Sequence, residues 1–246
     1  MTGTLIVALA SMMVATAFLS GIFGMAGGLI LMGVLLALLP VPEAMSLHAV
    51  TQMASNGWRG LLWIKYVRWR AAAAFLIGCA IAFAAWTVWG YVPSKPVTFL
   101  LLGVSPFVVR IVPASLKPDP EKYLHGACYG AACMVLMMLA GVSGPLVDSY
   151  FLGGNLNRRE IIATKAVCQI CGHAAKFAFF GGLADQAAGL DPLMAGVAVV
   201  MSIVGTSLAK PVLDRLSDTQ YRTWATHIIT VIAVVYLAQG SYLFLR

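Results

Sequence analysis

The sequence predicts an all-α membrane protein with ten helical segments, arranged as two inverted repeats of five. Three observations support this prediction. Of the 246 residues, 61% are hydrophobic and only 10% are charged, whereas a soluble domain carries about 25% charged residues. Proline, glycine and clusters of charge divide the chain into ten apolar runs. The chain also resembles itself when it is shifted by 117 residues.

Each apolar run is expected to form a helix, because backbone groups inside a bilayer must satisfy their own hydrogen bonds. The expected segments are 4–23, 28–39, 44–66, 70–91, 96–113, 121–140, 144–155, 159–182, 191–210 and 220–245. The first of them has no Lys or Arg before it, whereas a signal peptide normally carries positive charge there. The sequence ATA at residues 15–17 resembles a cleavage site, but small residues also pack membrane helices together. A first transmembrane helix is therefore the favoured interpretation.

Two runs, 28–39 and 144–155, are shorter than the roughly 20 residues that a membrane span requires. The first run begins at the last residue of the glycine-rich sequence GMAGG at 24–28, and the second begins within GVSGP at 141–145. We interpret both runs as short broken helices. The unpaired N–H groups and the dipole at such a helix start attract an anion, and glycine lets the anion approach the backbone. The alternative is that these glycines only permit tight helix packing.

The two segments after the short runs carry polar residues at intervals of three or four, which places them on one face of a helix. Polar groups inside a membrane are costly and usually face a cavity. The basic residues near the helix ends can alternatively extend to the membrane surface. The two polar faces consist of His48, Gln52, Ser55 or Asn56, and Arg59 in segment 44–66, and of Lys165, Gln169, Gly172 or His173, and Lys176 in segment 159–182.

Three acidic residues lie in or beside these segments. Asp148, in the second short run, is a candidate coupling residue, and its alternatives are a pairing with a basic residue or a structural role toward a neighbouring helix. Glu43 and Glu160 lie just before the two polar segments. A carboxylate at a helix N-terminus is favourable for the dipole alone, so capping is their expected role.

The other segments are expected to be ordinary membrane helices. Trp and Tyr residues around 58–69 and 86–91 are typical of membrane interfaces. All five cysteines lie in apolar segments, and an odd number there argues against a disulfide framework. The sequence CQIC at 168–171 has the spacing of a redox motif, but buried cysteine in an apolar helix usually packs as a small hydrophobic residue.

The internal repeat divides the chain into residues 1–117 and 118–246, which form one membrane domain. No gap is needed to align the halves, and the two short runs fall on each other. The Glu and Gln matches are the most informative, because apolar sequence produces chance identities. The matched pairs are Gly24 with Gly141, Gly27 with Gly144, Leu29 with Leu146, Leu35 with Leu152, Glu43 with Glu160, Ala49 with Ala166, Val50 with Val167, and Gln52 with Gln169.

Loop charges favour ten segments and an inverted second half. The loops after odd-numbered segments are rich in Lys and Arg, which predicts that they are cytoplasmic and that both termini lie outside. Half-crossing or re-entrant short segments remain an alternative. The basic residues of the odd loops are Lys65, Arg68, Arg70, Lys117, Lys122, Arg158, Arg159, Lys210, Arg215 and Arg222, against Lys95 and Arg246 on the other side.

Inverted repeats with matching short helices are typical of secondary transporters, whose site lies near the bilayer midplane and whose halves rock against each other. We expect a small anion as the substrate, with backbone and side-chain donors and positive charge around it. The chain lacks the Walker A pattern, which argues against direct use of ATP. The candidate binding residues are Gly24, Gly27, Gly28, Gln52, Asn56, Arg59, Gly141, Ser143, Gly144, Lys165, Gln169 and His173.

The sequences GIFGMAGGLILMGVLLALLPVPEAMSLHAV at 21–50 and GVSGPLVDSYFLGGNLNRREIIATKAV at 141–167 carry a resemblance to a known family. They resemble the sulfite exporter TauE/SafE family, in which a glycine-rich turn opens a short helix once in each half. The resemblance covers the whole chain and is strongest over 18–66 and 135–182. It implies transport, with export favoured, of sulfite or an organosulfonate such as sulfoacetate. GMAGG and GVSGP depart from GIGGG, the commoner form of this motif in the family, so the resemblance does not identify the exact anion.

Two other classes of function remain as alternatives: an intramembrane enzyme, and an assembly or scaffold protein without a solute. The motifs HExxH and GxSxG are absent from the sequence, and we expect no catalytic residue, metal or cofactor. The expected partners are the anion, the lipid bilayer, and a coupling proton or sodium ion, but no nucleic acid. A homo-oligomer remains open. The expected location is the bacterial inner membrane.

Overall fold

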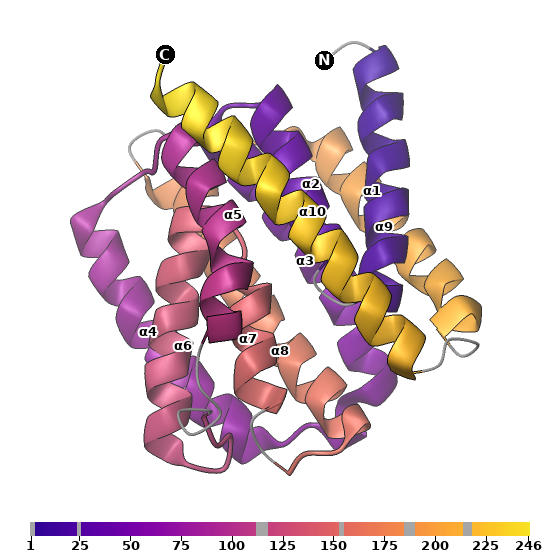
Figure 1. The fold of residues 1–246 in the computed structure, drawn as a ribbon, viewed down its shortest axis with the longest axis vertical. Coiled ribbons are helices and arrows are strands. Elements are labelled where there is room, and N and C mark those ends of the chain that lie inside the picture. The colour runs from indigo at the N-terminus through magenta and orange to yellow at the C-terminus, as the bar shows by residue number, and fades with distance from the viewer. Residues whose placement is uncertain (1–2, 24–25, 112–117, 153–154, 185–189, 214–217) are drawn as a thin grey trace.

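The computed structural model describes residues 3–23, 26–111, 118–152, 155–184, 190–213 and 218–246. The described residues form ten α-helices and no strand (Figure 1). The helices are α1 (Gly3–Phe23), α2 (Ala26–Leu38), α3 (Val41–Trp63), α4 (Trp69–Trp89), α5 (Lys95–Ile111), α6 (Tyr123–Ala140), α7 (Gly144–Leu152), α8 (Arg158–Ala178), α9 (Pro192–Leu213) and α10 (Asp218–Phe244). A 3-10 turn, η1 (Ile64–Tyr66), follows α3, and a π-helical turn, η3 (Phe179–Leu183), follows α8.

The all-α fold and the ten segments predicted from the sequence are therefore confirmed. The two short helices occur where the glycine-rich sequences place them, with α2 at Ala26–Leu38 for the expected 28–39 and α7 at Gly144–Leu152 for the expected 144–155. The prediction for the end of α7 extends over residues 153 and 154, which lie outside the described residues.

Local sequence explains several helix ends. Asn157 and Glu160 form a capping box at the start of α8: the Asn157 side chain accepts from the backbone of Glu160, and the Glu160 side chain accepts from the backbone of Asn157. Glu43 lies in the first turn of α3, which begins directly after Pro40. Gly90 and Gly141 end α4 and α6 in the left-handed conformation, at φ +68° and +77°.

Five helices of the described part of the chain are long and apolar enough to cross a membrane: α1, α4, α6, α9 and α10. Helices α3 and α8 are of similar length, but their polar residues lower their hydropathy. These two helices pack against each other. A protein partner for each polar helix keeps part of its surface away from lipid, which reduces the cost of polar groups in a membrane.

Helix pairing follows a regular scheme. The most extensive contacts join α1 with α9, α4 with α6, α3 with α8, and α5 with α10. In the repeat, α1 corresponds to α6, α3 to α8, α4 to α9 and α5 to α10. If every helix is replaced by its counterpart, the same four pairs result. Helices α3 and α8 also begin 117 residues apart. This scheme is what a two-fold repeat would produce, and the inverted arrangement of the halves stays a prediction.

Three of the loops that were expected to be cytoplasmic meet at one end of the bundle. Arg68, after α3, forms ion pairs with Glu121, before α6, at 3.2 Å and with Glu160, at the start of α8, at 3.3 Å. Figure 1 shows the start of α1 and the C-terminal end of α10 at the opposite end of the molecule. Which side of the membrane each end of the bundle faces stays a prediction from the loop charges.

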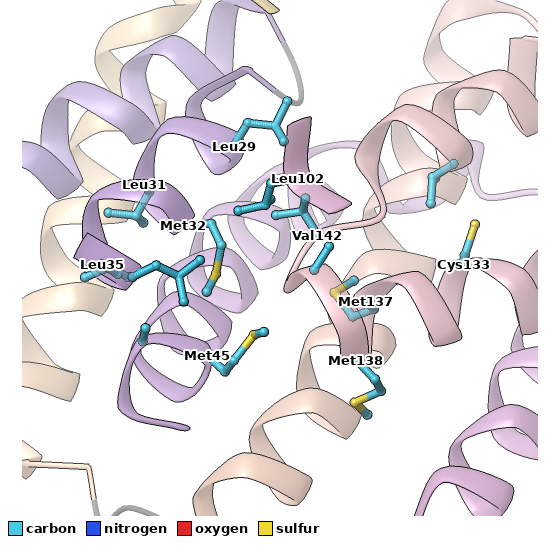
Figure 2. Close-up of a cluster of buried hydrophobic side chains, with 14 of the residues drawn as sticks. Leu29, Leu31, Met32, Leu35, Met45, Leu102, Cys133, Met137, Met138 and Val142 are labelled. Carbon is cyan, nitrogen blue, oxygen red and sulfur yellow. The ribbon is translucent and has the colours of Figure 1, made fainter. Parts of the chain in front are cut away.

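An apolar core surrounds the short helix α2. Buried side chains from α2, α3, α5 and α6 gather there, as Figure 2 shows for Met32, Met45, Leu102 and Met137. Gly141 lies against the sulfur atoms of Met32 and Met45. Methionine side chains adapt their shape to irregular space, so this core fits around the interrupted helices. Its contacts hold α2 against the second half of the chain.

Candidate functional site

A cavity lies where α2, α3, α7 and α8 meet. Its empty volume is about 390 Å³, a figure that includes space open to the outside. Every one of these four helices, or the residues just before it, contributes to the wall. The lining residues are Gly28, Leu29, His48, Gln52, Arg59, Val142, Ser143, Gly144, Lys165, Gln169 and His173.

The starts of the two short helices both form part of the cavity wall. Gly28 is in the first turn of α2, and Ser143 and Gly144 lie where α7 begins. The N-terminus of a helix carries about half a positive charge and N–H groups without helical partners. At Gly28 the absence of a side chain matters, because a Cβ there would lie 3.3 Å from the Gln52 side-chain oxygen Oε1. The cavity therefore offers two positive helix ends to a negatively charged ligand.

Helix α3 contributes an amide and a guanidinium group. Gln52 is only 6% exposed, and its side chain lies beside the backbone of Gly28. Arg59 donates to the backbone oxygen of Ser20 and to the hydroxyl of Ser55, each at 3.4 Å. Ser55 is held in turn by a 2.9 Å hydrogen bond with Thr206 of α9. The guanidinium group is thus fixed at the cavity by α1 and by its own helix.

Helix α8 contributes an ion pair, an amide and an imidazole. Lys165 donates to Asp148 of α7, and both side chains are mostly buried. Gln169 lies one helical turn further along the same wall. The His173 side chain is buried, and its Nδ1 atom has no hydrogen-bond partner among the described residues. A buried ring nitrogen without a partner at a cavity wall is a group that a ligand can satisfy.

His48, which lines the cavity, and Lys176, which does not, connect α3 with α8 and α6. Lys176 is 0% exposed, and its Nζ atom donates to the Gly141 backbone oxygen at 2.7 Å and lies 2.8 Å from His48 Nδ1. The Nε2 atom of His48 lies 2.9 Å from the Gly28 backbone oxygen. The interpretation that Lys176 extends to the membrane surface is therefore wrong, because the side chain points into the protein.

Eight of the twelve candidate binding residues line this one cavity: Gly28, Gln52, Arg59, Ser143, Gly144, Lys165, Gln169 and His173. Of the other four, Gly24 lies outside the described residues. Asn56 is buried and donates to the Gln52 backbone oxygen at 2.9 Å, away from the wall. Their common cavity makes the eight residues a coherent candidate site.

Two glycines that we expected to donate backbone N–H groups have other roles. Gly27 packs against α1, where a side chain would overlap the backbone oxygen of Thr16. The N–H group of Gly141 donates to the Met137 oxygen at the end of α6. Tight helix packing, the alternative considered for these sequences, is therefore the role of Gly27, and helix termination is the role of Gly141.

The candidate set omitted His48, Leu29 and Val142, which also line the cavity. His48 had a detectable signal, because it belongs to the polar face of α3 and corresponds to Lys165 in the internal repeat. The apolar residues Leu29 and Val142 had no such signal, since their side chains do not differ from those of the neighbouring core.

Asp148 is paired with a basic residue, which is one of the alternatives that the sequence left open. Glu160 caps α8, as expected. A second, more apolar hollow lies behind Ser143 and Gln169 and includes the buried thiols of Cys79, Cys133 and Cys168. Within the described part of the chain, no three His, Cys, Asp or Glu side chains are grouped closely enough to hold a metal ion.

Comparison with known proteins identifies the family of this chain. The family model described as sulfite exporter TauE/SafE matches residues 8–236, and so includes all of the cavity residues. No curated protein and no solved structure gives a significant match. Because the family model covers nearly the whole chain, this multi-pass membrane protein belongs to the TauE/SafE family of sulfite exporters.

Proposed function

We propose that this protein is a secondary transporter that carries sulfite or a small organosulfonate such as sulfoacetate across the bacterial inner membrane. The observation that carries the proposal is the single cavity bounded by the starts of α2 and α7, by two glutamine side chains and by the basic groups of Arg59 and Lys165. Membership of a sulfite exporter family supports a small sulfur-containing anion as the substrate.

The charge around the cavity favours an anion. Arg59 and Lys165 bring two positive charges to the wall, and Asp148 offsets one of them. The helix starts add partial positive charge. Gln52 and Gln169 supply amide N–H donors for oxygen atoms. A sulfite or sulfonate group has a negative charge and three oxygen acceptors, so it can accept hydrogen bonds from such donors and is attracted by such positive groups.

The pairing of corresponding helices supports alternating access as the transport mechanism. The cavity takes one short helix and one polar helix from each half of the chain. Rocking one half against the other would open such a site first to one side and then to the other. Export is the proposed direction, with the basic loops in the cytoplasm and both termini outside.

The test is a flux assay in liposomes with sulfite, sulfate, thiosulfate, sulfoacetate and simple carboxylates, each with and without a proton gradient. The expected result is saturable flux of sulfite or a sulfonate, with little flux of the carboxylates. Chemical conversion of the substrate would instead favour an intramembrane enzyme. Folded protein that moves none of the sulfur anions would favour a scaffold and would contradict the proposal.

A further inference from the structure

A cluster of three basic side chains extends from the cavity into the protein interior. This basic cluster consists of His173, His48 and Lys176. The ring centroids of the two histidines are 5.5 Å apart, and His48 Nδ1 is 2.8 Å from Lys176 Nζ. Both histidines line the cavity, whereas Lys176 lies behind them. All three side chains are buried, with exposed fractions of 2%, 0% and 0% in the order given.

The hydrogen bonds determine where the protons of this cluster lie. A backbone oxygen only accepts, so His48 Nε2 carries a proton toward Gly28 and Lys176 Nζ donates to Gly141. With Nε2 protonated, a neutral His48 ring accepts at Nδ1 from Lys176. A neutral amine has two N–H groups, which these two acceptors satisfy, and an ammonium ion has three. The cluster therefore keeps its hydrogen bonds whether or not it holds an additional proton.

The additional proton has no carboxylate to neutralise it in the described part of the chain. Lys176 contacts a histidine and a backbone oxygen, and Asp148 is already paired with Lys165. An unpaired charge inside a protein costs several kcal/mol, and the cost is also large inside a membrane. A negatively charged ligand in the neighbouring cavity would supply the missing opposite charge.

Several other titratable groups lie on the helices around the cluster. Arg59 and Lys165 line the cavity together with the two histidines, and Lys165 is paired with Asp148. On the α10 side, the Tyr236 hydroxyl donates to the Leu29 oxygen at 2.7 Å. On the α4, α6 and α8 sides, the groups are the thiols of the second hollow, Cys79, Cys133 and Cys168. Arginine does not release its proton in proteins, and Lys165 has its own carboxylate. Lys176 is therefore the cation of this region best suited to releasing and regaining a proton.

We propose that the basic cluster is the coupling site of the transporter, where Lys176 takes up a proton when the anion enters the cavity. The proton and the anion then cross the membrane together, so export down the sulfite gradient carries a proton outward, and an inward proton gradient opposes it. The two bind cooperatively, because each makes the binding of the other more favourable by the same factor. This inference rests on the proposed function, since it assigns a second transported species to the same site.

The experiment measures labelled sulfite in liposomes that contain the wild-type protein, Lys176→Met, Lys176→Arg or Asp148→Asn. Two modes are compared for each protein: exchange of internal for external sulfite, and accumulation driven by a proton gradient in sodium-free buffer. For the wild type, a gradient of one pH unit is expected to drive about tenfold accumulation for each coupled proton. Both Lys176 variants are expected to exchange sulfite but to lose accumulation, because neither methionine nor arginine can cycle the proton. Asp148→Asn is expected to retain accumulation driven by the proton gradient, and this accumulation, rather than the exchange rate, is the readout for that variant.

The variants also separate this inference from the chemistry of sulfite itself, which can carry its own proton. If the proton travels on the substrate, the Lys176 variants will accumulate sulfite as well as the wild type does, and the inference is overturned. It is also overturned if Asp148→Asn alone loses accumulation, or if only a sodium gradient drives the wild type. Wild-type flux that does not respond to the proton gradient also overturns the inference, and this result does not depend on whether the Lys176 variants fold. Absence of all sulfur-anion flux would instead contradict the proposed function.

Discussion

The polar faces of α3 and α8 occupy corresponding positions in the two halves, but their basic residues differ in burial and in hydrogen-bond partners. His48 and Lys165 correspond in the repeat. His48 is buried and hydrogen-bonded to neutral or basic groups, whereas Lys165 is paired with the carboxylate of Asp148. At the other end of each face, Arg59 reaches the cavity and Lys176 is fully buried behind it.

The difference shows how a repeated scaffold can hold an asymmetric site. Arg59 and Lys176 each donate to a backbone oxygen near the end of the helix that precedes a short helix, Ser20 of α1 and Gly141 of α6. Their positions are therefore alike, but their surroundings are not. The first half presents a permanent charge to the cavity, and the second half places a titratable amine beside it.

The largest effect is expected at Lys165, the paired basic residue of the second half. Replacing Lys165 by Met leaves the Asp148 carboxylate unpaired beside the cavity, where it repels an anion. We expect the apparent affinity for sulfite to fall about 30-fold, or about 2 kcal/mol. Equilibrium binding of labelled sulfite to the purified protein measures this change.

The matched control removes the carboxylate as well. The double variant Lys165→Met/Asp148→Asn should regain most of the lost affinity, and Asp148→Asn alone should bind at least as well as the wild type. If the double variant binds no better than Lys165→Met, repulsion by Asp148 does not explain the loss.

The next effect tests the two positions at which the halves are alike. Gln52→Ala and Gln169→Ala each remove an amide from the cavity wall. A hydrogen bond to a charged group contributes about 1.5–3 kcal/mol, so sulfite flux should fall about tenfold or more in each variant. Flux in liposomes and size-exclusion profiles measure transport and folding separately. Normal transport by both variants would remove the glutamines from the site.

A third pair of variants distinguishes packing from ligand approach in neighbouring residues of α2. A Cβ at Gly27 overlaps the backbone of Thr16, so Gly27→Ala should destabilise the fold by about 1–3 kcal/mol. A Cβ at Gly28 meets the flexible end of Gln52 at 3.3 Å, so Gly28→Ala should fold normally but transport more slowly. Thermal unfolding and liposome flux, measured on both variants, check the contrast. The opposite result, with the greater loss of stability at Gly28, would contradict the assignment of these two glycines.

The smallest effect concerns Asn56, which corresponds to His173 but lies off the cavity wall. Asn56→Ala loses one hydrogen bond to a backbone oxygen, which costs about 1 kcal/mol of stability, and should change sulfite flux less than about twofold. A severe transport defect in folded Asn56→Ala protein would show that the cavity extends further along α3 than the structure indicates.

Much of the architecture follows directly from sequence patterns. Apolar runs and glycine-rich breaks locate the ten helices, and spacing of three or four residues predicts the two polar faces. The same spacing identifies Gln52 and Gln169, because an amide on an apolar membrane helix is costly unless it faces a cavity or a polar neighbour. The position of Glu160 at a helix start predicts its capping role, which the structure confirms.

Sequence patterns fail where the role of a residue depends on its tertiary neighbours. Gly27 and Gly28 are adjacent and chemically identical, but one faces α1 and the other faces Gln52. Lys176 lies near the end of α8, where a lysine normally extends to the membrane surface. The packing of α3 and α6 around it encloses the side chain instead. No pattern within α8 alone could reveal that enclosure.

The most direct measurement is a crystal structure with selenite, an analogue of sulfite whose selenium atom scatters anomalously. The account predicts an anomalous peak in the cavity between α2 and α7, within hydrogen-bond reach of Gln52 and Gln169. A peak at another place in the protein, or none at all in a protein that transports selenite, would contradict it.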